Sequence, residues 1–154
     1  MDTAAIRGRS TAALAVLLLV AFLAQGVRAG DAHAATRGRD TMLSLTNTDR
    51  AKHDRDALAL NSQLSRYAKK HSRDMAARGD LFHTEDLAGK LSGLDWSIGG
   101  ENVGVGSSLD GLEDVFMAST MHRRNILRPT FDHSAVGVYR DDDERFWVTV
   151  IFYG

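Results

Sequence analysis

The stretch RFWVTVIFY, residues 145–153, decides the fold class. Its alternating positions form two largely apolar faces, Val148, Val150 and Phe152 on one and Trp147, Thr149, Ile151 and Tyr153 on the other. A strand with two apolar faces is typical of a sheet that is covered on both sides. Helices before and between the strands can supply both covers. The sequence therefore predicts an α/β fold, a three-layer α-β-α sandwich around a small, mainly antiparallel sheet.

Two further strands are predicted over 98–105 and 135–139, and residues 141–144 form the turn before the last strand. A mostly polar helix is predicted over 41–56. A second helix begins after Asn61, a good N-cap residue, and ends at Gly79, a good C-terminal cap. Its buried face follows the helical period and consists of Leu64, Ala68, His71 and Met75.

The segment 85–97 shows no clear period and is expected to be a loop. A third helix begins after Ser107 or Ser108, and Pro129 marks its end or the end of a short helix that follows. We expect one stripe of this helix to face the core, made of Leu112, Val115, Phe116 and Ser119.

The amino terminus resembles a secretory signal peptide. Arg7 and Arg9 precede an uncharged run over 11–24, and small residues follow. The run is shorter than the ~20 residues that span a bilayer. We predict a signal peptide over 1–29 with cleavage after Ala29 or, alternatively, after Ala34, and an uncleaved anchor is the rival interpretation. Residues 30–40 are small, polar and charged and are predicted to be a linker, and 41–154 form the domain.

Composition excludes several classes of function. The chain has 19 basic and 20 acidic residues, and removal of 1–29 leaves 16 basic and 19 acidic, a net charge of −3. This balance argues against a nucleic-acid partner. The chain contains no cysteine. It must therefore fold on its apolar core alone, and it has neither a thiol nucleophile nor a thiolate metal ligand.

The glycine-rich stretch GGENVGVG, residues 99–106, places Glu101 inside a predicted strand. Its glycines allow neighbouring groups to approach closely. His83 and His122 lie 18 and 21 residues away and are candidate partners. Together the three side chains could bind a divalent ion such as zinc, share protons, or form a structural hydrogen-bond network. No HExxH motif is present, so spacing alone does not choose among these. His71 is expected to be a core residue.

Four segments, taken in order, resemble the CAP superfamily of cysteine-rich secretory, antigen 5 and pathogenesis-related 1 proteins, also called SCP-like. They are residues 60–76, PheHisThr (82–84), GlyGluAsnValGlyValGly (100–106) and SerThrMetHisArgArgAsnIleLeu (119–127). The short cysteine-free chain is similar to the bacterial branch, and the resemblance covers about 41–154. It implies an α-β-α sandwich with a cleft lined by two histidines and two acidic residues.

By position, the resemblance assigns His83, Glu101 and His122 to this cleft. Ser119 stands where many relatives have the second acidic residue. A hydroxyl is a poor metal ligand, which weakens a four-residue metal site. Ser119 and His122 share a helix face, but the sequence shows no orienting acid, so a serine hydrolase is not favoured.

The resemblance implies an exported protein that acts at the cell envelope or extracellularly, in a binding or interaction role with no established reaction. Its expected partners are a lipid, a cell-envelope polymer or another protein, with membrane contact only through an uncleaved signal segment. The alternative is a divalent-metal-dependent hydrolase of peptidase type. In that case His83 and His122 would hold the ion, and Glu101 would activate water or serve as a third ligand.

Other polar residues receive structural interpretations. Asn47 and Arg50 match an Asn-x-x-Arg pattern in the first helix of the family, and we expect both to stabilise the fold. Arg123, Arg124 and Arg128 could contact anionic polymer or lipid phosphate, although a solvated basic face is the simpler interpretation.

Overall fold

The computed structural model of the protein describes residues 29–154, with side chains from residue 36 onward. The signal peptide predicted over 1–29 therefore lies almost entirely outside the described residues. Among those residues, no helix combines the length and the apolar character needed to cross a membrane.

A four-stranded sheet with the order β1-β3-β4-β2 forms the centre of the fold. Its strands are β1 (Ala59–Leu60), β2 (Gly99–Gly106), β3 (His133–Arg140) and β4 (Phe146–Tyr153). The central strand β4 pairs antiparallel with both β2 and β3 over its full length. Strand β1 adds a two-residue parallel pairing to the start of β3. The sheet is therefore mainly antiparallel, as predicted.

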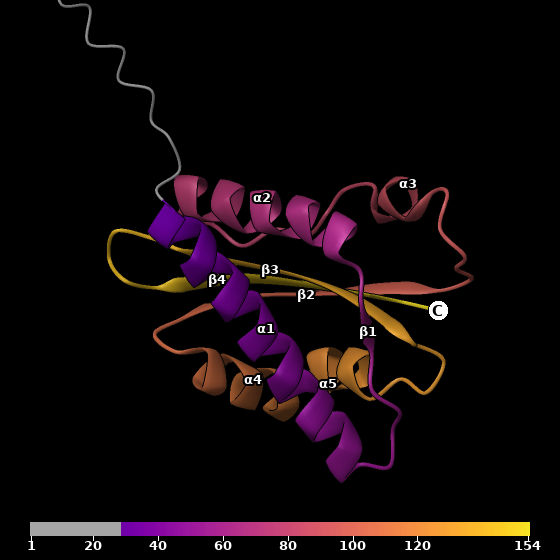
Figure 1. The fold of residues 1–154 in the computed structure, drawn as a ribbon. Coiled ribbons are helices and arrows are strands. Elements are labelled where there is room, and N and C mark those ends of the chain that lie inside the picture. Colours follow the sequence, from indigo (N-terminus) through magenta and orange to yellow (C-terminus); the bar gives the residue numbers. More distant parts are fainter. Residues whose placement is uncertain (1–28) are drawn as a thin grey trace, which may run out of the picture.

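Helices cover both faces of this sheet. Helices α2 (Ser62–Arg78) and α3 (Leu87–Leu91) lie above it in Figure 1, and α4 (Leu109–Ala118) and α5 (Thr120–Ile126) lie below it. Ile151 and Tyr153 of β4 pack with Leu64 and Ala68 of α2. On the opposite face, the core cluster includes Phe116, Ile126, Val148, Val150 and Phe152. The two-faced character of 145–153 and the three-layer sandwich are confirmed.

Helix α2 has the caps that the sequence predicts. The side chain of Asn61 accepts a hydrogen bond from the Leu64 N–H, and Gly79 ends the helix with a φ of 66°. The helix lies very close to β3, because a Cβ on Gly137 would stand 2.1 Å from the carbonyl carbon of Ala68. Only glycine permits this approach. It fixes how deeply α2 sits on the sheet.

The linker expected over 30–40 is helical in the structure. Helix α1 spans Ala29–Lys52 and crosses the sheet at β3 (Figure 1). Gly38 packs against Val138, since a Cβ on Gly38 would lie 3.1 Å from Val138 Cγ1. The segment contains no proline to end the helix. Its polar composition, which suggested a tether, is also compatible with a helix, on which Thr36, Arg37 and Asp40 are exposed.

Two local expectations were wrong. The segment 85–97, expected as a loop, contains the five-residue helix α3. On α4, the buried face consists of Leu109, Leu112, Glu113 and Phe116, whereas Val115 is 61% exposed. Glu113 faces the first helix, where its Oε2 accepts a hydrogen bond from Thr46. The helix is therefore rotated relative to the stripe expected from apolar residues alone.

Arg50 and Asn47 stabilise the fold, as expected. The guanidinium of Arg50 is buried and donates to the backbone carbonyls of Asp56, Ile126, Arg128 and Phe131. The side chain of Asn47 accepts from the Leu58 N–H and donates to the Leu58 carbonyl. Arg50 thereby joins the end of α1 to the chain that follows α5.

Candidate functional site

Glu101 and Asn102 project to opposite faces of β2. The Glu101 carboxylate contacts the 82–84 segment, which follows α2. Asn102 instead bonds α5, through the carbonyl of His122 and the side chain of Asn125. Successive side chains of a strand alternate between the two faces. The Gly-Glu-Asn motif therefore links the two helical layers through one strand.

The carboxylate of Glu101 is almost fully buried and holds the 82–84 segment. Thr84 donates its backbone N–H to Oε2 at 2.8 Å and its hydroxyl to Oε1 at 2.9 Å. His83 Nδ1 lies 3.2 Å from Oε2. Because a carboxylate oxygen only accepts, Nδ1 carries the proton of this bond. The charge of a buried carboxylate needs such donors, and here one short segment supplies them.

His83 itself faces solvent. Its side chain is 62% exposed, whereas that of Glu101 is 4% exposed. With Nδ1 donating to Glu101, the neutral imidazole keeps Nε2 as a hydrogen-bond acceptor or metal ligand. The structure therefore brings together these two predicted site residues: Glu101 is the buried acceptor that holds the ring, and His83 is the exposed group.

His71 is a further neighbour of Glu101 that the sequence analysis placed only in the core. It is buried, and its Nε2 lies 3.7 Å from Glu101 Oε1. The same nitrogen lies 2.9 Å from the carbonyl oxygen of Phe82, which only accepts, so Nε2 is protonated. The Phe82 ring meets the His71 ring edge-on, with centroids 4.9 Å apart. His71 is therefore both a core residue and a support for the 82–84 segment.

His122 occupies a different environment on α5. Its Nδ1 is buried without a hydrogen-bond partner among the described residues, and its ring lies 4.9 Å from that of Phe116. Burial, followed by repulsion from His83, lowers the pKa of His122 from 6.5. The two imidazoles are thus within electrostatic reach. In the described part of the chain, however, no hydrogen bond joins the His122 ring to His83 or Glu101.

Two asparagines fix the position of α5 against β2. Asn125 donates to the Asn102 side chain at 2.9 Å and to the Glu101 carbonyl at 3.2 Å. Asn102 in turn donates to the His122 carbonyl at 3.1 Å. A Cβ on Gly100 would stand 2.9 Å from Asn125 Oδ1, so the glycine permits this approach. The close approach expected of the glycine-rich strand is confirmed, whereas the asparagine network was missed.

Ser119 separates α4 from α5. It is the C-cap residue of α4 and the N-cap residue of α5, and its side chain makes no capping hydrogen bond to α5. Over the described residues, its hydroxyl makes no hydrogen bond to His122. The structure therefore offers no activated serine at this position.

The predicted divalent-metal site is not assembled in this arrangement. Among the side chains that the structure describes, those of residues 36–154, no group of three or more His, Cys, Asp or Glu is placed to hold an ion. Both oxygens of Glu101 are already engaged by Thr84 and His83. As placed, His83, Glu101 and His122 do not fit a three-ligand centre. Zinc binding by these residues stays a prediction.

Comparison with known proteins identifies relatives of the chain. It is 31% identical over 103 residues to the YkwD protein of Bacillus subtilis (strain 168), a match that covers 62% of this chain and 40% of that protein. An extracellular protein with an SCP domain from Bacillus anthracis str. Ames superimposes with a TM-score of 0.64 and 25% identity, over 77% of this chain and 41% of that one. The chain therefore spans less than half the length of either Bacillus protein.

An outer surface protein of Borrelia burgdorferi shares the fold, with a TM-score of 0.65 and 17% identity over 76% of this chain and 92% of that one. Residues 43–152, most of the chain, match the family described as CAP, the cysteine-rich secretory protein family. The match spans every element that builds the Glu101 site, from α2 to α5. The chain thus belongs to the CAP family, with bacterial SCP-domain proteins among its relatives.

Proposed function

We propose that this protein is an exported binding domain that acts outside the cell or at the cell envelope, and that it recognises its ligand around His83. The observation that carries the proposal is the bond between the buried carboxylate of Glu101 and the exposed imidazole of His83. The extracellular description of the Bacillus anthracis relative supports the location. The basic and apolar N-terminal sequence supports it as well.

The geometry favours recognition over hydrolysis. A general base needs a carboxylate oxygen that is free to take a proton from water. Glu101 instead accepts three hydrogen bonds from Thr84 and His83, so it acts as an anchor for the 82–84 segment. His83 keeps Nε2 as an acceptor. A ligand with a hydroxyl or protonated group can therefore bond this ring.

Retention by envelope material tests the proposal. The purified protein is incubated with cell-envelope fractions and with lipid vesicles, and the retained amount is measured for wild type, His83→Ala and His133→Ala. His133 is the control, because it is also a partly exposed histidine bonded to a carboxylate, that of Asp132. We expect retention of wild type and of His133→Ala, and reduced retention of His83→Ala. Failure of every fraction to retain wild type would count decisively against this function.

A further inference from the structure

A second polar surface lies away from Glu101, in a groove of about 1080 Å³ between α1, α2 and the β3–β4 hairpin. Phe146 of this groove pairs with Gly106, five residues along β2 from Glu101. That distance is roughly 17 Å along the strand. Arginines and lysines dominate its charge, namely Arg37, Arg66, Lys69, Lys70, Arg73 and Arg140.

Four of these cations form no close ion pair in the part of the chain that the structure describes. Arg37, Arg66, Lys69 and Arg73 take part in no ion pair with the described residues, while Lys70 pairs with Asp74 and Arg140 pairs with Glu144. Of the acidic residues that line the groove, Asp141 pairs with Arg145, and only Asp142 lacks an ion pair within the described part of the chain. The groove therefore carries an excess of positive charge in a chain whose net charge is −1.

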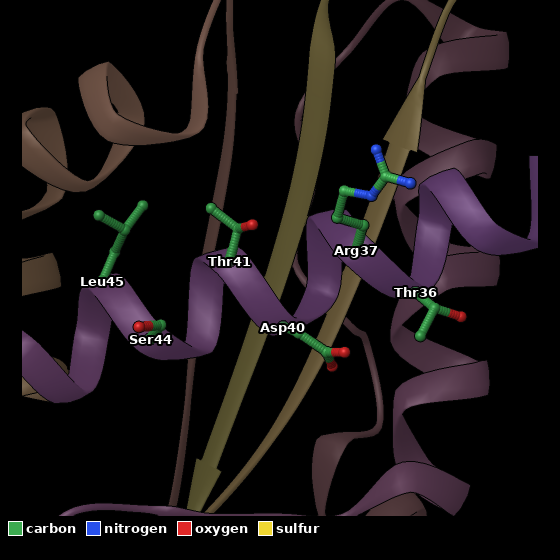
Figure 2. Close-up of a pocket in the computed structure, with 6 residues that line it drawn as sticks. All are labelled: Thr36, Arg37, Asp40, Thr41, Ser44 and Leu45. Carbon is green, nitrogen blue, oxygen red and sulfur yellow. The ribbon is translucent and has the colours of Figure 1, made fainter.

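The unpaired cations are spread along the groove and are not clustered at one position. Arg66, Lys69 and Arg73 recur at the helical period and therefore share one face of α2, over roughly 10 Å. Arg37 adds a cation from α1. Figure 2 shows Arg37 and Asp40 extending from α1 in different directions, and Asp40 pairs with Arg39 instead. Arg37 is thus left available to the groove.

The floor of the groove is partly apolar. Tyr139 and Phe146 of the β3–β4 hairpin line it, together with Val138 and Leu109. The guanidinium of Arg140 lies over the Phe146 ring, 5.5 Å from its centroid. A row of cations beside such a floor suits an extended chain with regularly spaced anionic groups, whose uncharged parts lie against the apolar side chains. Arginine binds phosphate through paired hydrogen bonds, and three of the four unpaired cations are arginines.

We propose that this groove binds an extended, phosphate-bearing polymer other than a nucleic acid along α2. The site goes beyond the function proposed for His83 and uses none of its residues. Because the groove is open to solvent, dissolved salt screens the attraction between its cations and the phosphate groups, so binding should weaken as the ionic strength rises. The cations are spread along the helix, so a single phosphate engages only part of the row.

Binding of inorganic polyphosphate to the full chain tests this site, with orthophosphate and phosphatidylglycerol vesicles as comparison probes. We expect polyphosphate to bind much more tightly than orthophosphate. Arg66→Glu and Arg73→Glu should each lower the affinity about tenfold or more. Arg55→Glu is the matched control, because Arg55 is an exposed arginine beyond the end of α1 and outside the groove.

Three results would overturn the proposal: no binding of polyphosphate at low ionic strength, equal losses in Arg66→Glu and Arg55→Glu, or binding of the vesicles without binding of polyphosphate. The last would indicate a membrane surface instead of a polymer groove. His83→Ala should leave polyphosphate binding unchanged, so this site and the function proposed for His83 fail independently.

Discussion

Thr84 donates both its backbone N–H and its hydroxyl to the carboxylate of Glu101, at 2.8 and 2.9 Å. The two residues are 17 positions apart and belong to different layers of the fold. These two hydrogen bonds fix the backbone of the 82–84 segment over β2. The orientation of His83 follows from this contact, because His83 immediately precedes Thr84 and bonds the same carboxylate.

Replacement of this carboxylate should destabilise the protein. In Glu101→Gln one oxygen becomes an amide donor, which faces the donors of Thr84 and His83. We expect a loss of about 1–3 kcal/mol in the free energy of unfolding, measured with urea. Glu85→Gln is the control, since Glu85 is exposed and close in sequence. Equal stability of Glu101→Gln and wild type would mean that the carboxylate does not hold the segment.

Arg50 should be among the most sensitive positions. Arg50→Ala removes the donors for the carbonyls of Asp56, Ile126, Arg128 and Phe131 and leaves a buried void. The expected loss is about 3–5 kcal/mol in the free energy of unfolding. Arg66→Ala, at an exposed arginine of α2, should change stability by less than about 0.5 kcal/mol. Similar losses for the two variants would contradict this account of Arg50.

Glu113 should make stability depend on pH. The pKa of its carboxyl is raised from 4.5 to about 7, chiefly by burial; the hydrogen bond from Thr46 and the charge of Lys52 oppose the rise, and Asp49 and Asp114 contribute to it. Because the folded-state pKa lies above the unfolded value, the stabilisation is fully present below pH 4.5 and is lost as the pH rises through about 7. The loss is up to about 3 kcal/mol.

Urea unfolding at several pH values, for wild type and Glu113→Gln, measures this contribution. The neutral amide can still accept from Thr46, so the variant should be more stable than wild type above pH 7, and the difference should shrink as the pH falls toward 4.5. A constant difference between the two proteins across this range would show that Glu113 does not titrate as described.

Zinc titration separates the binding domain from the alternative metal hydrolase. By calorimetry, we expect zinc to bind wild type no more tightly than the double variant His83→Ala/His122→Ala, because no three-ligand group is placed among the described side chains of residues 36–154. A saturable site in wild type that the double variant lacks would support the predicted metal site. It would also require the 82–84 segment to rearrange around Glu101.

The sequence predicted the layers of the fold because long elements show clear periods. The two apolar faces of 145–153 indicated the covered sheet, and Asn61 and Gly79 marked the ends of α2. Strand β1 and helix α3, with two and five residues, are too short for a period to be recognised. Residues 30–40, which belong to helix α1, were predicted to be a linker because a polar helix resembles a tether in composition.

The site was predicted only in part, because its bonds join residues far apart in the chain. The family resemblance and the Gly-Glu-Asn motif assigned His83 and Glu101 to one cleft, and a hydrogen bond joins the two side chains. His71 was assigned to the core from the period of α2, which cannot show what lies opposite its ring nitrogen. The bond between Asn102 and Asn125 spans 23 residues, and no local pattern indicates it.

The tautomer of His83 tests most directly whether Glu101 holds this ring for recognition. It can be read from the nitrogen chemical shifts of the imidazole by NMR at a pH well above 6.5, where an ordinary histidine is neutral. The account predicts a proton on Nδ1, bonded to Glu101, and an unprotonated Nε2 that faces the ligand. A ring that carries its proton on Nε2 would contradict it, because Nδ1 would then have no proton to donate to the carboxylate.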